Sequence, residues 1–163
     1  MNEIIYKPIG IIHSPFDTVS GMPIQPAAAK GIKGTVNVFA DYAAGLKDLE
    51  GFSHVILLYH FHLSIGYQLE VIPFLDDNKH GVFATSAPKR PNQIGLSVVR
   101  LIEVENNILH IEKVDVVNDT PLLDIKPYIP DFDKTEDIQI GWLSDSKHRL
   151  SSGKADDRFD FYF

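Results

Sequence analysis

The sequence contains no cysteine. This absence excludes disulfides, thiolate zinc sites, iron–sulfur clusters and a cysteine nucleophile, and it fits a reducing compartment. No apolar run approaches the roughly 20 residues that a membrane-spanning helix needs, and the longest runs only from Val55 to Tyr59. The first residues lack the basic head and the small-residue cleavage site of a signal peptide. We therefore expect a cytoplasmic protein without a membrane segment.

Basic residues are also in short supply. The chain has 15 Lys and Arg against 22 Asp and Glu, a formal net charge of -7. Phosphate contacts need lysine and arginine, so this charge argues against a general nucleic-acid coat protein. Contact with a nucleic acid would require a local basic patch or a second subunit. The sequence also lacks Gly-x-Gly-x-x-Gly and Gly-x-Ser-x-Gly, so neither a Rossmann nucleotide fold nor a serine hydrolase is supported.

The 163 residues have the length of one ordinary domain. Alternating or β-branched segments predict strands at residues 4–13, 34–39, 52–63, 81–85, 94–104, 108–117, 122–126 and 158–163. Asp41 is expected to begin a short helix that ends at Leu49. Many short strands with turn signals between them and little helix favour a barrel or a sandwich.

Three loops are unusually rich in proline, glycine and polar residues: 21–26, 85–97 and 118–130. Proline fixes the backbone angle φ, so such loops hold their amide and carbonyl groups in a defined geometry. This composition suits a pocket that binds a small ligand partly through main chain. Rigid turns between strands would explain the same composition.

Several motifs together resemble a known family. They are residues 8–16 (Pro-Ile-Gly-Ile-Ile-His-Ser-Pro-Phe), 25–26 (Gln-Pro), 49–54 (Leu-Glu-Gly-Phe-Ser-His), 82–85 (Val-Phe-Ala-Thr), 90–92 (Arg-Pro-Asn), 94–97 (Ile-Gly-Leu-Ser) and 124–128 (Asp-Ile-Lys-Pro-Tyr). In this order they resemble the TsaA-like proteins, also called TrmO, which are S-adenosylmethionine-dependent tRNA methyltransferases. Separate motifs in register are a more specific signal than any single one.

The resemblance implies a mainly β fold, a small antiparallel β-barrel with short helices and long Pro/Gly-rich loops. It implies a single domain over residues 1–163, without the additional C-terminal domain of longer bacterial members. The expected protein is a homodimer that binds S-adenosylmethionine near the subunit interface. Its expected reaction is N6-methylation of a threonylcarbamoyl-modified adenosine next to the tRNA anticodon.

The resemblance also assigns residues. The implied cofactor contacts are Gln25, Pro26, Ala27, His62, Leu63, Ser86, Leu96, Asn118, Asp119, Thr120 and Pro121. Many members have an arginine in place of Ser86 that contacts the cofactor, so Lys89 or Arg90 is expected to supply the missing cation. Lys89, Arg90 and Asn92 are also expected to contact the nucleic acid or substrate. Most members have glycine at the position of Asp119. Glycine adopts a positive φ freely, whereas an aspartate does so only with some strain.

Methyl transfer from a sulfonium is an in-line displacement, so positioning supplies most of the catalysis. Asp124 is the expected acceptor of a proton or hydrogen bond from the attacking amine, with Lys126 and Tyr128 orienting it or the base. Asp124 and Lys126 lie on the same face of a strand, so they could equally form a surface ion pair. Asp119 is the competing candidate for the catalytic carboxylate.

His60 and His62 share one strand face, and His54 has the same parity. Two such histidines could bind a metal, but no third ligand is evident nearby, and they are more often pocket walls, so we expect no metal. Two alternative functions remain open. One is a methyltransferase of the same fold that acts on a small molecule, and the other is a non-catalytic S-adenosylmethionine-binding barrel.

Overall fold

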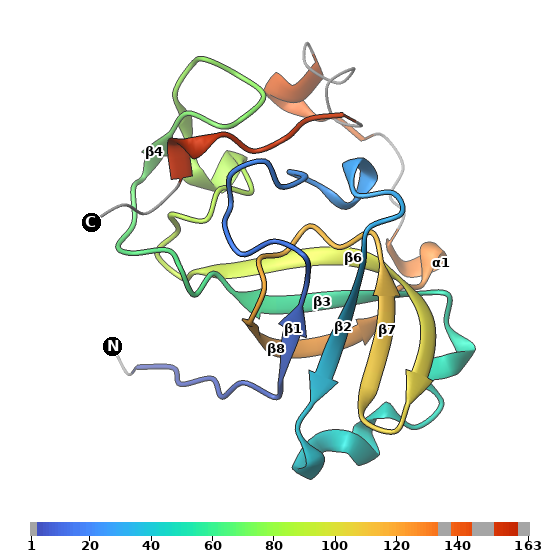
Figure 1. The fold of residues 1–163 in the computed structure, drawn as a ribbon. Coiled ribbons are helices and arrows are strands. Elements are labelled where there is room, and N and C mark those ends of the chain that lie inside the picture. Colours follow the sequence, from blue (N-terminus) through green and yellow to red (C-terminus); the bar gives the residue numbers. More distant parts are fainter. Residues whose placement is uncertain (1–2, 134–137, 145–151, 160–163) are drawn as a thin grey trace.

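The computed structural model describes residues 3–133, 138–144 and 152–159, and a closed antiparallel barrel forms its centre. The strands are β1 (Gly10–His13), β2 (Lys33–Val38), β3 (His54–His60), β6 (Ile94–Glu105), β7 (Ile108–Glu112) and β8 (Thr120–Pro127). Around the barrel their order is β1-β2-β7-β6-β3-β8, and β8 pairs with β1 to close it (Figure 1). The prediction of a mainly β, small antiparallel barrel is confirmed.

Strand alternation explains how the barrel is filled. Along β3 the side chains of Val55, Leu57 and Tyr59 are buried, and those between them are only partly buried. Successive side chains of a strand point to opposite faces, so one set fills the interior of a small barrel. The shared core is Ile12, Val36, Val38, Leu46, Leu49, Val55, Leu57, Tyr59, Val99, Leu101, Leu109, Ile111, Val114, Val116 and Leu122.

Short elements make up the rest of the described chain. β4 (Glu70–Val71) and β5 (His80–Gly81) form a separate two-stranded sheet, and α1 (Pro130–Asp133) follows β8. The 3-10 helices are Pro26–Ala28, Ala40–Leu46, Leu49–Gly51, Val82–Ala84, Gly141–Ser144 and Asp157–Phe159. None of the helices in the described ranges is long and apolar enough to cross a membrane.

Five sequence predictions differ from the structure. The predicted strand 81–85 is wrong, because Val82–Ala84 forms a 3-10 helix closed by the Thr85 amide on the Val82 carbonyl. The predicted helix 41–49 is two 3-10 helices, broken at Asp48, whose φ is +67°. The predicted strand 4–13 is shorter in the structure, because β1 begins only at Gly10. The predicted strand 108–117 is also shorter, because β7 ends at Glu112, before Lys113, whose φ is +68°. Of the predicted strand 158–163, the first two residues belong to a 3-10 helix and the last four lie outside the described residues.

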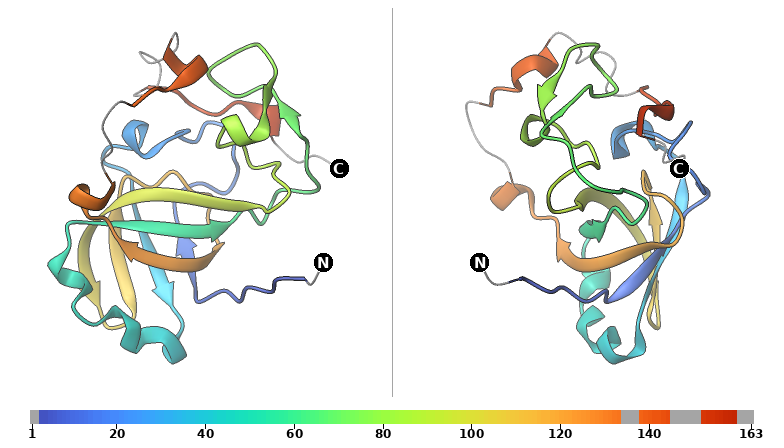
Figure 2. Two further views of the ribbon diagram at one scale, coloured as in Figure 1. Left: turned by 180° about the vertical axis from the view of Figure 1, so that it is seen from behind. Right: turned by 90° about the vertical axis from the view of Figure 1, so that its left-hand side faces the viewer.

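A layer of loops covers one end of the barrel (Figures 1 and 2). It has its own small apolar cluster of Val71, Val82, Ala87 and Phe159, against which Phe74 packs. The C-terminal segment 152–159 lies beside the loop between β1 and β2. Their backbones are joined by the bonds Gly21 N to Ala155 O, Ala155 N to Met22 O and Ile24 N to Gly153 O. Segments far apart in the sequence therefore meet above the barrel.

Candidate functional site

A cavity of about 650 Å³ lies between the loop layer and the barrel end. Its walls come from the β1–β2 loop, the end of β3, the Pro-rich turn with the start of β6, and the segment between β7 and β8. Much of its lining is apolar, as is usual for a pocket that binds a small molecule. It is lined by eight of the predicted cofactor-binding residues: Gln25, Pro26, Ala27, His62, Leu63, Ser86, Leu96 and Thr120.

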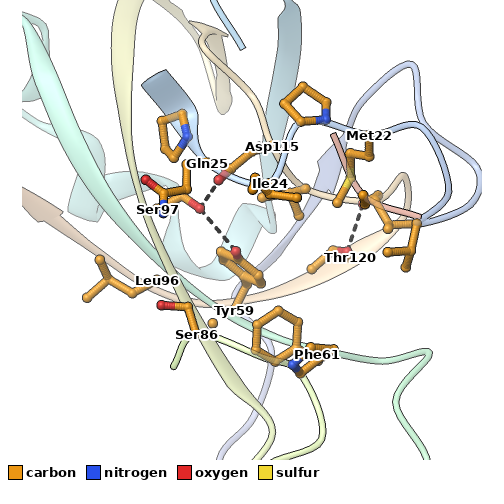
Figure 3. A pocket seen from close by; sticks show the side chains of 18 of the residues that line it. Met22, Ile24, Gln25, Tyr59, Phe61, Ser86, Leu96, Ser97, Asp115 and Thr120 are labelled. Carbon is orange, nitrogen blue, oxygen red and sulfur yellow. Dashed lines mark hydrogen bonds between the residues drawn. The ribbon is translucent and has the colours of Figure 1, made fainter. Parts of the chain in front are cut away.

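A chain of three polar side chains, Tyr59, Ser97 and Asp115, lines one wall of the cavity (Figure 3). The Ser97 hydroxyl donates a hydrogen bond of 2.7 Å to Asp115 Oδ1. The Tyr59 Oη lies 3.0 Å from Ser97 Oγ, and because the Ser97 proton is already engaged, Tyr59 is the donor. The three groups come from β3, β6 and the segment after β7, so the barrel itself positions them.

Burial changes the acidity of two of these groups. It raises the pKa of Asp115 from 3.8 to about 6, against the opposing effect of the Ser97 hydrogen bond. Burial and the neighbouring Asp115 raise the pKa of Tyr59 well above its usual range. At neutral pH the site therefore holds a largely ionised carboxylate and a neutral phenol.

His62 and Thr120 meet at another part of the wall. Thr120 Oγ1 lies 3.2 Å from His62 Nδ1 and donates to the Val117 carbonyl at 2.7 Å. Because the Thr120 hydroxyl proton is used in the bond to the carbonyl, the hydroxyl oxygen acts as the acceptor toward His62. The His62 Nδ1–H therefore donates to Thr120 Oγ1. Burial lowers the pKa of His62, and His60 adds to this effect while Asp119 opposes it. The ring is therefore neutral at physiological pH.

Three predicted cofactor-binding residues do not line the cavity. Asn118 holds the β1–β2 loop instead, through Ser14 N to Asn118 Oδ1 at 3.2 Å and Asn118 N to the Phe16 carbonyl. Asp119 has φ +61°, the left-handed conformation that the resemblance implies at this position, and its carboxylate lies 3.0 Å from His13 Nδ1. Pro121 pairs with β1. Direct cofactor contacts by these residues stay predictions.

Of the predicted substrate-contacting residues, only Arg90 lines the cavity. Its guanidinium donates to the carbonyls of Val82, Thr85 and Ala87, so it organises the loop that carries Ser86. Lys89 and Asn92 lie in the same Pro-rich turn; Asn92 is exposed and Lys89 is partly buried. Replacement of the missing arginine by Lys89 or Arg90 also stays a prediction.

The predicted catalytic residues lie on or just after β8 and do not line the cavity. Asp124 Oδ2 forms an ion pair of 2.8 Å with Lys126 Nζ, and about half of each side chain is exposed. The Tyr128 ring meets the His54 ring edge-on, with 6.4 Å between centroids. A direct catalytic role for Asp124, Lys126 or Tyr128 stays a prediction.

Sequence reasoning missed Tyr59, Ser97 and Asp115. The useful signal was an acid inside the apolar run 114–117, where a lone carboxylate needs a reason to be present. Within the described residues, no group of three His, Cys, Asp or Glu side chains is arranged to hold a metal ion.

Comparison with known proteins places this geometry in a family. A probable S-adenosyl-L-methionine-binding protein of Pyrococcus abyssi is 56% identical over 96% of this chain and 85% of its own length. A tRNA (adenine(37)-N6)-methyltransferase of Escherichia coli is 39% identical over 80% of this chain and 60% of its own. The crystal structure of TrmO from Pseudomonas aeruginosa matches with a TM-score of 0.74 and 38% identity, over 86% of this chain and 62% of that one.

The chain thus spans less than two thirds of the bacterial methyltransferases that it resembles. Residues 11–134, most of the barrel and the cavity-lining loops, match the family described as the tRNA-methyltransferase O N-terminal domain. The protein belongs to the TrmO family.

Proposed function

We propose that the protein binds S-adenosylmethionine in the cavity and transfers its methyl group to N6 of a modified adenosine next to a tRNA anticodon. This proposal rests on one observation: eight of the residues that the family resemblance assigns to cofactor binding line the same cavity. Its volume of about 650 Å³ lies within the range of 300–1,000 Å³ usual for ligand pockets. The names of the Pyrococcus abyssi and Escherichia coli relatives support the cofactor and the reaction, respectively.

The cavity suits the chemical parts of this cofactor. Phe61 and Tyr59, whose rings pack edge to face at 5.5 Å, offer aromatic surface for an adenine ring. The β1–β2 loop supplies the Gln25 amide next to apolar side chains. When bound, the cofactor supplies a methyl group on a cationic sulfur, and the walls of this chain exclude water and fix the direction of that methyl.

Binding and transfer are tested separately. Calorimetry with purified protein should give a micromolar dissociation constant for S-adenosylmethionine. Transfer is then measured with methyl-labelled cofactor and tRNA from cells that make or lack the threonylcarbamoyl group, followed by nucleoside mass spectrometry. Label in N6 of the threonylcarbamoyl-modified adenosine alone is the expected result. The absence of heat and of thermal stabilisation at millimolar cofactor would contradict the proposal.

One observation favours a second candidate, a non-catalytic S-adenosylmethionine-binding barrel. The predicted catalytic Asp124 is paired with Lys126 away from the cavity, and the relative from Pyrococcus abyssi is named only for binding. Cofactor binding without transfer to either tRNA would support this candidate. Transfer to a small molecule instead would support a methyltransferase of the same fold with a different acceptor.

A further inference from the structure

Asp115 is a carboxylate that the known features of the site leave without a purpose. It lines the cavity but stands outside the residues that family resemblance assigns to the cofactor. The side chain is largely enclosed by protein and retains a partly accessible surface toward the cavity. A buried charge carries a large desolvation cost, so its presence calls for a partner.

The protein orients this carboxylate without neutralising it. Ser97 donates to Oδ1, and Tyr59 in turn donates to Ser97 (Figure 3). Gly95 lies directly against the Tyr59 ring, where a Cβ would overlap ring atoms. The absence of a side chain at Gly95 therefore allows the ring to pack in this position. Ser97 fixes Oδ1, and the backbone amide of Asp115 adds a second hydrogen bond to the carboxylate.

No cation of the described residues forms an ion pair with Asp115. The other titratable side chains lining the cavity are Tyr59, His62 and Arg90. Tyr59 and His62 are neutral at pH 7, for the reasons given above, and Arg90 bonds three backbone carbonyls through Nη1 rather than pairing with Asp115. The cavity is therefore prepared for a cation that arrives with the ligand.

S-Adenosylmethionine carries two cationic groups, the sulfonium and the α-ammonium. A carboxylate at the sulfonium would stabilise a charge that disappears during methyl transfer, and so would slow the reaction. The α-ammonium keeps its charge throughout and has N–H donors that match a carboxylate oxygen. We propose that Asp115 is the residue that recognises the α-ammonium of the cofactor's amino-acid end, an inference that rests on the proposed function.

The test compares three ligands by calorimetry on the wild type and on Asp115→Asn. S-Adenosylmethionine has both cations, S-adenosylhomocysteine has only the ammonium, and 5′-methylthioadenosine has neither. Removing one member of a buried charge pair is costly, so the variant should bind the first two at least tenfold more weakly and the third unchanged. Asp41→Asn, an exposed change on the 3-10 helix after β2, is the control and should alter none of them.

Each other outcome overturns the assignment. An effect on S-adenosylmethionine alone would place Asp115 at the sulfonium, and an equal effect on all three ligands would place it at the nucleoside. Unchanged affinities would remove Asp115 from recognition while leaving the proposed function standing. A wild type that binds none of the ligands would instead remove the proposed function and this inference together.

Folding is checked on the same samples by melting curves. If Asp115→Asn does not fold, the pH dependence of wild-type binding takes its place. Affinity for S-adenosylhomocysteine should fall relative to that for 5′-methylthioadenosine as Asp115 gains its proton near pH 6. His62, whose pKa is lowered, lines the same cavity, and the ratio of the two affinities cancels any effect it has on the nucleoside that both ligands share. A ratio of affinities that stays constant from pH 8 to pH 5, a range spanning the expected titration, would overturn the proposal.

Discussion

Gly95 at the start of β6 governs the shape of the cavity wall at the scale of single residues. A Cβ at this position would overlap the Tyr59 ring and lie 2.9 Å from Phe61 Cζ. We expect Gly95→Ala to lower the free energy of unfolding by about 1–3 kcal/mol, the usual cost of overpacking, and to weaken ligand binding because the ring must move. Gly45→Ala is the matched control, since a Cβ there meets nothing within 4 Å. Equal melting temperatures and affinities for both variants would contradict the expectation.

Asp115 should make the stability of the free protein depend on pH. Its pKa is about 6 in the folded protein and 3.8 in the unfolded reference, so the folded state holds the proton more tightly. The contribution of Asp115 to the free energy of unfolding is therefore greatest below about pH 4, and it is lost as the pH rises through about 6. The two-unit difference corresponds to a loss of up to about 3 kcal/mol. Urea unfolding of wild type and Asp115→Asn from pH 4 to pH 7 should show this component only in the wild type, and parallel pH profiles would contradict it.

At the scale of elements, the 82–90 loop depends on Arg90. Its guanidinium bonds three carbonyls of that loop and lies 5.9 Å from the centroid of the Phe83 ring. All three bonds come from Nη1 while the planar guanidinium lies over the Phe83 ring, and a lysine ammonium lacks this planar group. Arg90→Lys should therefore lower the melting temperature and weaken cofactor binding about tenfold. Arg100→Lys is the control, because among the described residues the Arg100 side chain, itself largely exposed, forms a single ion pair, with Glu112 at 3.4 Å. Two variants with the same melting temperature and affinity would refute a structural role for the guanidinium.

β8 carries the predicted catalytic carboxylate, and Asp124→Asn separates chemistry from scaffolding. The exposed pair with Lys126 is worth about 0–1 kcal/mol, so the variant should fold and bind cofactor nearly as the wild type does. If Asp124 accepts a hydrogen bond from the target amine, single-turnover methyl transfer should fall about a hundredfold. Melting curves on the same samples control for folding. Normal turnover by a folded variant would eliminate Asp124 from the mechanism.

Alternation was enough to predict β2, β3, β6 and the β6–β7 hairpin from the sequence. It failed where one backbone angle resets the pattern. Leu109 and Ile111 are buried at odd positions, but after Lys113, at φ +68°, the buried residues are Val114 and Val116. Asp115 was therefore read as one residue of a strand, and its partner Ser97, distant in sequence, gave no local sign. Family resemblance recovered most of the cavity's loops because their motifs are local.

The whole molecule presents apolar side chains around the cavity mouth. Leu63, Ile94 and Leu96 line the cavity and are still exposed by 38%, 38% and 61%, and Phe83 of the neighbouring loop is exposed by 75%. Several exposed apolar side chains close to one site are typical of an interaction surface. We propose that a second copy covers it, in a two-fold homodimer with two cavities near the interface.

Light scattering at tens of micromolar, a generous concentration for an obligate dimer, should give twice the mass of one chain. Phe83→Asp should shift the population toward monomer, because it places a charge in an apolar interface. Phe132→Asp, an equally exposed phenylalanine on α1, is the control and should leave the mass unchanged. A monomeric wild type would contradict the dimer and leave cofactor binding to be judged on its own assay.

The junction between segment 152–159 and the β1–β2 loop has a consequence for how this family can diversify. Ala155 lines the cavity, yet it and its neighbours hold the loop through backbone amides and carbonyls, which every residue except proline provides. The segment lies beyond residues 11–134, the range shared with the family. A substitution at Ala155 can therefore reshape the cavity from one homologue to the next while the backbone bonds that hold the loop are kept, whereas Phe159, buried in the apolar cluster, is constrained by its packing.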